Sequence, residues 1–196
     1  MKKLNKAICS VIAVIGIMTG STVYDATTAT EPVGDVVIEN QHVASLRVSP
    51  AGLRIIGNAE GCRLEPYTCP AGLPTNGIGN THDVKREAIS LEQVAKDWAA
   101  NIKDAERCIE NAEEKSGQTL TQGQFDAFVS FSFNTGCTRF MRNRDGSRTQ
   151  IYTKIIRGEF DAACNELPRW VYGGGQRLNG LVIRRGKEHA RCFASN

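Results

Sequence analysis

The sequence predicts an α+β fold that is mostly α-helical, with short strands confined to one region. Hydrophobic residues recur at three- and four-residue intervals from Leu91 to about Glu114, the pattern of an amphipathic helix of more than twenty residues. Residues 66–79 instead space proline and glycine like turns between short strands. A chain of 196 residues, 41% of them hydrophobic, is long enough to bury one core divided between two lobes.

A hydrophobic segment opens the chain. Three lysines within the first six residues precede an apolar run over residues 7–20. This run has the length of a signal-peptide core, whereas the wider stretch 4–24 is just long enough to span a bilayer, although weakly. In both cases the positive flank stays in the cytoplasm and the rest of the chain is exported. Residues 1–30 are therefore either a cleavable signal peptide or a releasable membrane anchor. The lack of a clean small-x-small cleavage site favours the anchor.

The next residues lead into a short helix. Residues 31–48 lack strong periodicity and predict a linker, with at most one short strand at 36–38. Ser49 and Pro50 are typical of an N-cap followed by proline at the first helical position, and Gly61 is typical of a helix end. Glu60 is therefore expected at the end of this helix beside the core, where a carboxyl group can act as a general acid.

The remaining elements are predicted to be helices. Ser90 caps the long helix and Thr121 opens a second one that ends near Gly136; in both cases a glutamine three residues on completes a capping box. Residues 139–147 are polar and basic and predict a surface loop. Three further helices are predicted at 149–157, 160–167 and 181–193, the last with Arg184, Arg185 and Glu188 on a solvated face.

Charge and composition exclude several classes of function. The net charge is +3, and the three N-terminal lysines account for all of it, so the rest of the chain is neutral. A nucleic-acid partner is therefore not expected, and the sequence has no phosphate-binding glycine loop. With three histidines and no C-x-x-C pair, we expect neither a metal site nor a cofactor.

The spacing of three residues defines the candidate site. Glu60, Cys69 and Thr75 follow the pattern Glu, eight residues, Asp or Cys, five residues, Thr, with Gly-Ile-Gly at 77–79. This pattern resembles the signature of the phage-type muramidases, the T4-lysozyme-like endolysins of glycoside hydrolase family 24. Family-like segments at 125–136 and 168–172 extend the resemblance over most of the chain. It implies a lysozyme-like two-lobed catalytic domain over 49–196, with a small β-hairpin lobe and a helical lobe, preceded by the anchor helix.

The resemblance also implies a reaction, the hydrolysis of the β-1,4 bond between N-acetylmuramic acid and N-acetylglucosamine in peptidoglycan. Glu60 would be the general acid. The Cys69 thiolate would replace the usual carboxylate, and Thr75 would hold the attacking water or the thiolate. Weaker substrate contacts are expected from Asn134, Thr135, Trp170 and Arg177. Counted from Trp170 without gaps, Arg177 aligns with a family arginine that pairs with the acidic glutamate. Asn80 departs from the family, which commonly has histidine there.

The odd number of cysteines, seven, predicts disulfides with one thiol left over. The pattern resembles signal-anchor-release endolysins, in which a disulfide at the catalytic cysteine is exchanged after the anchor leaves the membrane. Carried across, Cys62–Cys69 is the inactive pair and Cys9–Cys62 the active one. The protein would be a monomer, tethered to the periplasmic face of the host inner membrane and then released to the periplasm. Of three possible connectivities for the other cysteines, we prefer Cys108–Cys137 with Cys164–Cys192.

Two other functions fit the same residues. A cysteine peptidase acting on peptidoglycan stems would use Cys69 as nucleophile and His82 or His189 as base. A secreted wall-binding domain would bind peptidoglycan without cleaving it. Replacing Glu60 with glutamine separates the muramidase from the peptidase, because only the muramidase needs this acid.

Overall fold

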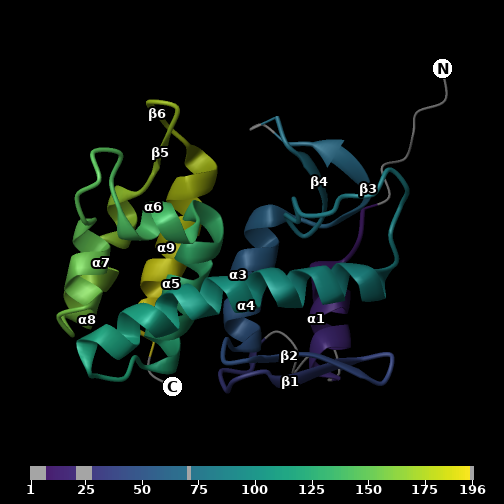
Figure 1. The fold of residues 1–196 in the computed structure, drawn as a ribbon, viewed down its shortest axis with the longest axis horizontal. Helices are drawn as coiled ribbons and strands as arrows, with labels where there is room; N and C mark the ends of the chain where they lie inside the picture. Colours follow the sequence, from purple (N-terminus) through teal and green to yellow (C-terminus); the bar gives the residue numbers. More distant parts are fainter. Residues whose placement is uncertain (1–7, 21–27, 70–71, 195–196) are drawn as a thin grey trace.

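The computed structural model describes residues 8–20, 28–69 and 72–194. Within these ranges the fold is mostly helical and contains three two-stranded antiparallel hairpins. The long helix α4 crosses the molecule, with the β3–β4 hairpin near its first residues and the later helices near its other end (Figure 1). The elements in order are α1 (Val11–Thr19), β1 (Gly34–Ile38), β2 (Gln41–Leu46), α3 (Pro50–Glu60), β3 (Arg63–Thr68), β4 (Pro74–Gly77), α4 (Leu91–Ser116), α5 (Gln122–Thr135), α6 (Cys137–Met141), α7 (Gln150–Ile155), α8 (Phe160–Cys164), the 3-10 helix η1 (Leu167–Arg169), β5 (Tyr172–Gly173), β6 (Gln176–Arg177) and α9 (Asn179–Cys192).

Local sequence signals set the helix ends. The Ser49 hydroxyl accepts a hydrogen bond from the Gly52 N–H, and Pro50 begins α3 as predicted. Ser90 caps α4 in the same way, but the Gln93 side chain donates to Asp97 Oδ1 and does not complete the predicted capping box. Gly117 ends α4 in a left-handed conformation. The predicted capping box of α5 is complete, because the Thr121 and Gln124 side chains each bind the other residue's backbone N–H.

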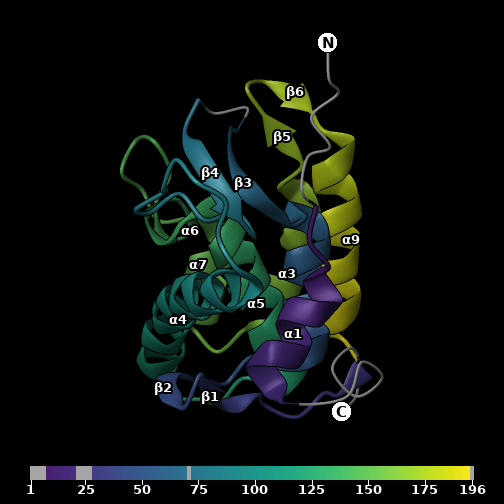
Figure 2. The same ribbon diagram turned by 90° about the vertical axis from the view of Figure 1, so that its right-hand side faces the viewer.

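The core lies between α4, α5, α9 and α3. Trp98 is buried in the face that α4 turns towards the core, as its spacing predicts. Three phenylalanines of α5, at 125, 128 and 131, are fully buried against it. Figure 2 shows α3 and α9 running side by side, and both pack against α5. Helix α3 therefore rests on the helical core, which positions its last residue, Glu60.

Residues 31–48 are more ordered than the predicted linker. The strand allowed for at 36–38 is part of β1, and β1 pairs with a second strand, β2, that the sequence did not predict, with the register Val36↔Ala44. Val36, Ile38, Ala44 and Leu46 are buried in the core, and the hairpin packs under α4 (Figure 1). The missed signal is the alternation of these buried positions within each strand.

The N-terminal helix α1 packs against the rest of the protein. Val14, Ile15 and Met18 are buried, and α1 contacts α3, α4 and β1. Its approach to α3 is close, because a Cβ added at Gly57 would lie 2.3 Å from Val11 Cγ1. None of the described helices has the length and apolar composition needed to cross a bilayer. The N-terminal lysines and residues 21–27 of the predicted targeting segment lie outside the described residues.

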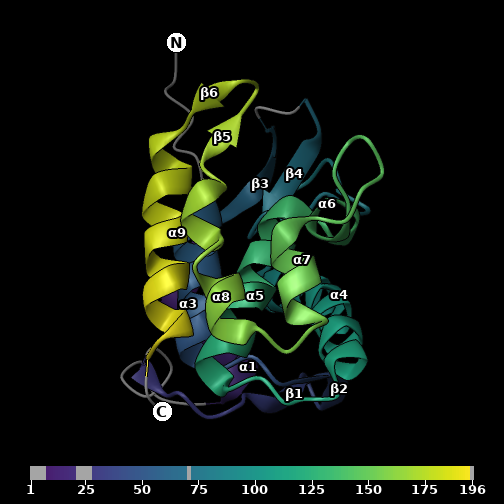
Figure 3. The ribbon, with the colours of Figure 1, turned by 90° about the vertical axis from the view of Figure 1, so that its left-hand side faces the viewer.

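Three disulfides join distant elements. Cys9 is bonded to Cys62, which ties the start of α1 to the end of α3. Cys108–Cys137 joins α4 to α6, and Cys164–Cys192 joins α8 to the end of α9, the two pairings that the sequence favours. Figure 3 shows α8 beside α9. Cys69, the one cysteine outside these three disulfides, keeps its thiol.

Candidate active site

Glu60 lies beside helix α9 and the turn after β4. It is the last residue of α3, and its side chain is 23% exposed. Gly61 ends the helix with a φ of 74° and leads directly into β3. Glu60 Oε1 accepts a hydrogen bond of 2.5 Å from Nη1 of Arg184, which lies on α9. The carboxylate is therefore held at the surface of the helical core while one side of it faces solvent.

The arginine that pairs with Glu60 is Arg184, and the predicted alignment of Arg177 with this role is wrong. Arg177 is exposed on β6. Arg184 follows Arg177 by seven residues and lies on α9, beyond the β5–β6 hairpin. The solvated face predicted for Arg184, Arg185 and Glu188 is also wrong, because all three side chains are buried and bind one another.

The turn after β4 approaches Glu60 from the other side. Gly79 has a φ of 69°, and a Cβ added there would lie 3.2 Å from Glu60 Oε2. The backbone conformation therefore favours glycine, and a larger residue would make a tight contact with the carboxylate. Asn80, which replaces the family histidine, is buried and holds the turn together: its amide donates to Asn76 Oδ1 and to the His82 carbonyl, and its oxygen accepts from Asn101 on α4.

Cys69 and Thr75 lie at the tip of the β3–β4 hairpin. The Cys69 N–H donates to the Leu73 carbonyl at 3.0 Å, and the thiol is partly exposed. Thr75 is buried, pairs with Tyr67 in the hairpin register, and donates its hydroxyl to the Leu73 carbonyl at 3.1 Å. The two predicted catalytic residues of this hairpin are thus tied to the same backbone carbonyl.

Tyr67 connects this hairpin to Glu60 electrostatically. Burial raises the pKa of the Tyr67 phenol, the nearby Arg63 guanidinium opposes that rise, and the charges of Glu60 and Cys69 add to it. The Arg63 guanidinium stacks 4.3 Å from the centre of the Tyr67 ring. The phenol therefore lies within electrostatic range of both Glu60 and Cys69.

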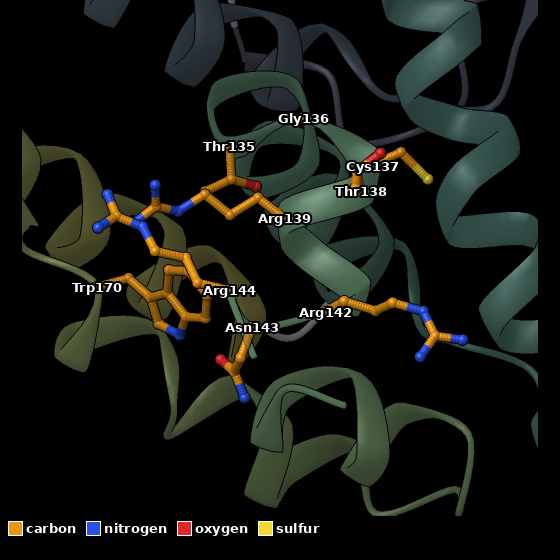
Figure 4. A pocket seen from close by; sticks show the side chains of 9 residues that line it. All are labelled: Thr135, Gly136, Cys137, Thr138, Arg139, Arg142, Asn143, Arg144 and Trp170. Atoms are coloured by element: carbon orange, nitrogen blue, oxygen red, sulfur yellow. The ribbon is translucent and has the colours of Figure 1, made fainter. Parts of the chain in front are cut away.

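Two of the predicted substrate residues line a hollow in the helical part of the molecule. Thr135 and Trp170 line a hollow of about 530 Å³ together with the start of α6 and the following loop. Figure 4 shows the Arg139 and Arg144 side chains extending to the same side as Trp170, whereas Arg142 points the other way. Neither Arg139 nor Arg144 forms an ion pair within the part of the chain that the structure describes. The hollow is therefore positively charged and open to an anionic ligand.

Asn134 forms a side-chain hydrogen bond within the protein. Its side-chain oxygen accepts a hydrogen bond from Arg185 Nη2, which leaves the amide hydrogens as its remaining donors. A second hollow, of about 240 Å³, lies between the turn after β4 and helices α4 and α5, and is lined by Gly79, His82 and Asn101 among others. Of the predicted substrate residues, Thr135 and Trp170 line the first hollow, Asn134 binds Arg185, and Arg177 is exposed on the β5–β6 hairpin.

The residues that the sequence missed are the buried charges of α9 and the arginines of the hollow. The α9 group has a usable signal, since Arg184, Arg185 and Glu188 have the i, i+3 and i+4 spacing of ion pairs. Their burial is not visible in the sequence. Among the described residues, no group of three His, Cys, Asp or Glu is arranged to hold a metal ion.

Sequence comparisons agree with this geometry. Residues 57–188 match the family Phage lysozyme. A SAR-endolysin of Escherichia phage P1 is 42% identical over 155 residues, which are 76% of this chain and 83% of the relative. A SAR-endolysin of Haemophilus phage HP1 is 41% identical over 153 residues, which are 75% of this chain and 81% of the relative.

Solved structures give the same result. The active form of the P1 phage endolysin Lyz has a TM-score of 0.73 at 35% identity, with 95% of each chain covered. Its secreted inactive form has a TM-score of 0.53 at 40% identity, over 75% of this chain and 96% of that one. The muramidase domain of SpmX from Asticaccaulis excentricus has a TM-score of 0.64 at 26% identity, over 76% and 98% of the two chains. The fold is thus lysozyme-like.

Proposed function

Because the chain belongs to the phage lysozyme family, and is therefore a glycoside hydrolase of the lysozyme type, we propose that it hydrolyses the β-1,4 bond between N-acetylmuramic acid and N-acetylglucosamine to lyse a bacterial host. The observation that carries the proposal is the position of Glu60. Its carboxylate ends a buried helix, touches the buried Arg184 and faces the Gly79 turn. A wall-binding domain has no need of such a carboxylate.

The reaction starts with Glu60. As general acid it donates its proton to the glycosidic oxygen of the leaving sugar while positive charge develops on the other sugar ring. The Cys69 thiolate supports this step, either by stabilising the oxocarbenium-like charge or by assisting the attacking water. The Thr75 hydroxyl donates to the Leu73 carbonyl, so its oxygen is left to accept a hydrogen bond from that water.

The substrate lies along the wall formed by Thr135 and Trp170. Peptidoglycan stems carry carboxylates, and the unpaired guanidinium groups of Arg139 and Arg144 give the adjoining hollow the complementary charge. Asn134 contributes its amide hydrogens, and Arg177 contacts the substrate from the exposed hairpin. The partners are therefore peptidoglycan and, through the N-terminal segment, the host inner membrane. The protein acts as a monomer, without a cofactor.

Activation is by disulfide exchange. In the tethered protein a Cys62–Cys69 bond removes the thiolate, and after release to the periplasm the Cys9 thiol takes over Cys62 and frees Cys69. The bonded pair Cys9–Cys62 and the Cys69 thiol are the arrangement expected of the active form. The better match to the active than to the inactive P1 endolysin supports the same assignment.

The acid is tested by replacing Glu60 with glutamine in the full chain and measuring new reducing ends from purified peptidoglycan. We expect the Glu60→Gln variant to lose at least about a thousandfold in rate, because no other group donates the proton. Glu87→Gln is the matched control, since Glu87 is exposed. Retained hydrolysis in Glu60→Gln would overturn the proposal. A peptidase would release new amino termini without reducing ends, and would be inactivated by His82→Ala.

A further inference from the structure

Glu188 lies at the centre of the buried network that ends at Glu60. Its side chain is completely buried on α9. Oε1 accepts hydrogen bonds from Arg184 Nε at 3.0 Å and from Ser130 Oγ at 2.6 Å, and Oε2 accepts from Arg185 Nη1. We propose that Glu188 is a positioning residue: it orients the general acid through Arg184, and Asn134 and Trp170 through Arg185. The proposal rests on the proposed role of Glu60.

Arg184 is fixed on three sides. Its Nε donates to Glu188, its Nη2 donates to the Ser130 carbonyl at 2.9 Å, and its Nη1 is thereby left pointing at Glu60 Oε1. The guanidinium is planar, so fixing two of its nitrogens sets the direction of the third. Without Glu188 the Nε–H would be buried without its acceptor, and the side chain would turn to find another. Glu188 therefore determines where Arg184 holds the Glu60 carboxylate.

Arg185 connects Glu188 to Trp170 and Asn134. Its Nε donates to the Trp170 carbonyl at 3.1 Å, and its Nη2 donates to Asn134 Oδ1. The guanidinium also lies 4.6 Å from the centre of the Phe131 ring, which packs against Trp170. Glu188 anchors the remaining nitrogen, Nη1. One carboxylate thus sets the positions of Asn134 and Trp170 as well as of the acid.

The charges of the network also point to Glu188. The two arginines are 4% and 1% exposed and are countered by two carboxylates, Glu60 at the open end and Glu188 at the closed end. If Glu188 were neutral, both arginines would compete for Glu60 as their remaining anion. The acid would then be drawn towards the core and away from the bond it must protonate.

A purely structural role for Glu188 makes a different prediction. In that case its loss lowers stability, and activity falls only as the protein unfolds. Glu106 is a matched control, because it is also a fully buried glutamate, accepting from the Val48 N–H at 2.7 Å and from Lys103. It lies on α4 outside both hollows.

The experiment compares Glu188→Gln with Glu106→Gln in the full-length protein, at a temperature where circular dichroism shows both variants fully folded. The rate of reducing-end release is measured over a range of soluble peptidoglycan concentrations. We expect kcat of Glu188→Gln to fall about tenfold to a hundredfold, since misplacing a catalytic group by about 1 Å has that effect. Glu106→Gln should keep kcat within about twofold, although both melt earlier than wild type.

A double variant shows whether Glu188 acts through Arg184. In an Arg184→Gln background the acid has already lost its partner, so adding Glu188→Gln should lower kcat by clearly less than it does alone, and the loss that remains reflects the Arg185 branch. If Glu188→Gln keeps wild-type kcat, or costs as much in that background as alone, Glu188 does not position the acid.

Ser130→Ala covers the case in which Glu188→Gln does not fold. The Ser130 hydroxyl donates to Glu188 Oε1, so its removal loosens the carboxylate without changing charge. We expect a loss of about threefold to fivefold in kcat, and no loss would count against the positioning role. The Glu60→Gln variant distinguishes failure of the proposed function from failure of the positioning role. If Glu60→Gln retains activity, the proposed function fails. If Glu60→Gln is inactive while the Glu188 and Ser130 variants keep wild-type kcat, only the role of Glu188 is contradicted.

Discussion

Glu60 and Arg184 are 124 residues apart in the sequence, and Oε1 of one lies 2.5 Å from Nη1 of the other. The pair joins the end of α3 to the buried face of α9. Glu60, the proposed general acid, is therefore held by the helical core. Its environment depends on residues that the sequence pattern around Glu60 does not contain.

Arg184→Lys tests this pair directly. Lysine keeps the charge but has no planar fork, so it cannot bind Glu60, Glu188 and Ser130 together. We expect reducing-end release from peptidoglycan to fall about a hundredfold. Arg54→Lys, on the exposed side of α3, is the control and should retain full activity. An active Arg184→Lys variant would mean that charge alone is sufficient at this position.

Gly79→Ala should damage the acid's surroundings. The new Cβ would lie 3.2 Å from Glu60 Oε2, on a backbone with a φ of 69°. Gly117→Ala, at a φ of 65° with open space around it, carries the backbone strain without the contact. Both variants should lose about 1 kcal/mol of unfolding free energy, measured by urea denaturation. Only Gly79→Ala should also lose activity, about tenfold; equal activities would show that the contact is relieved without cost.

Gly57→Ala should disturb the docking of α1. The added methyl group would lie 2.3 Å from Val11 Cγ1, so α1 must shift away from α3. After reduction and reoxidation of the full chain, peptide mapping should show less Cys9–Cys62 and more Cys62–Cys69. Adding Val11→Ala removes the shortest contact and should shift the pairing back towards that of the wild type, while the 3.2 Å approach to the Trp98 ring remains. Unchanged pairing in Gly57→Ala would show that α1 docking does not guide the choice of disulfide.

The Cys108–Cys137 disulfide should matter for substrate as well as for stability. It closes a separation of 29 residues, and Cys137 lines both hollows. Replacing both cysteines with alanine should cost about 3 kcal/mol and raise KM for peptidoglycan. The Cys164–Cys192 bond closes 28 residues and lines neither hollow, so the same change there should cost similar stability and leave KM alone. Equal KM values for the two variants would contradict a role in substrate binding.

The arginines of the hollow should recognise anionic stems. The double variant Arg139→Gln/Arg144→Gln is expected to raise KM about tenfold on peptidoglycan with intact stems, because two charge-assisted hydrogen bonds are lost. The change should be small on glycan strands freed of their stems by an amidase. Arg148→Gln, in the same loop but outside the hollow, serves as control. An equal rise in KM on stem-free glycan would place these arginines against sugar instead.

Elements with a local cause could be predicted from the sequence. The N-caps of α3, α4 and α5 and the hydrophobic face of α4 follow from side chains within a few residues of one another. The spacing of Glu60, Cys69 and Thr75 is also local, since it covers one helix end and the hairpin that follows it.

Features that depend on distant contacts could not be predicted. The β1–β2 hairpin lies in a segment of weak periodicity, and its hydrophobic residues are buried because α4 and α1 cover them. Arg177 lies on an exposed strand of the short β5–β6 hairpin, whereas Arg184, on the helix that follows, lies beside Glu60.

The sequence by itself determined the family-like catalytic pattern, the long helix and its caps, because each is encoded by residue type at short spacing. The tertiary structure alone decided that the charged side of α9 faces inward. A helix with Arg184, Arg185 and Glu188 at these positions can present them to solvent or to the core. Burial becomes tolerable only when Glu60, Ser130 and Asn134, brought together by α3 and α5, satisfy the arginines' hydrogen bonds.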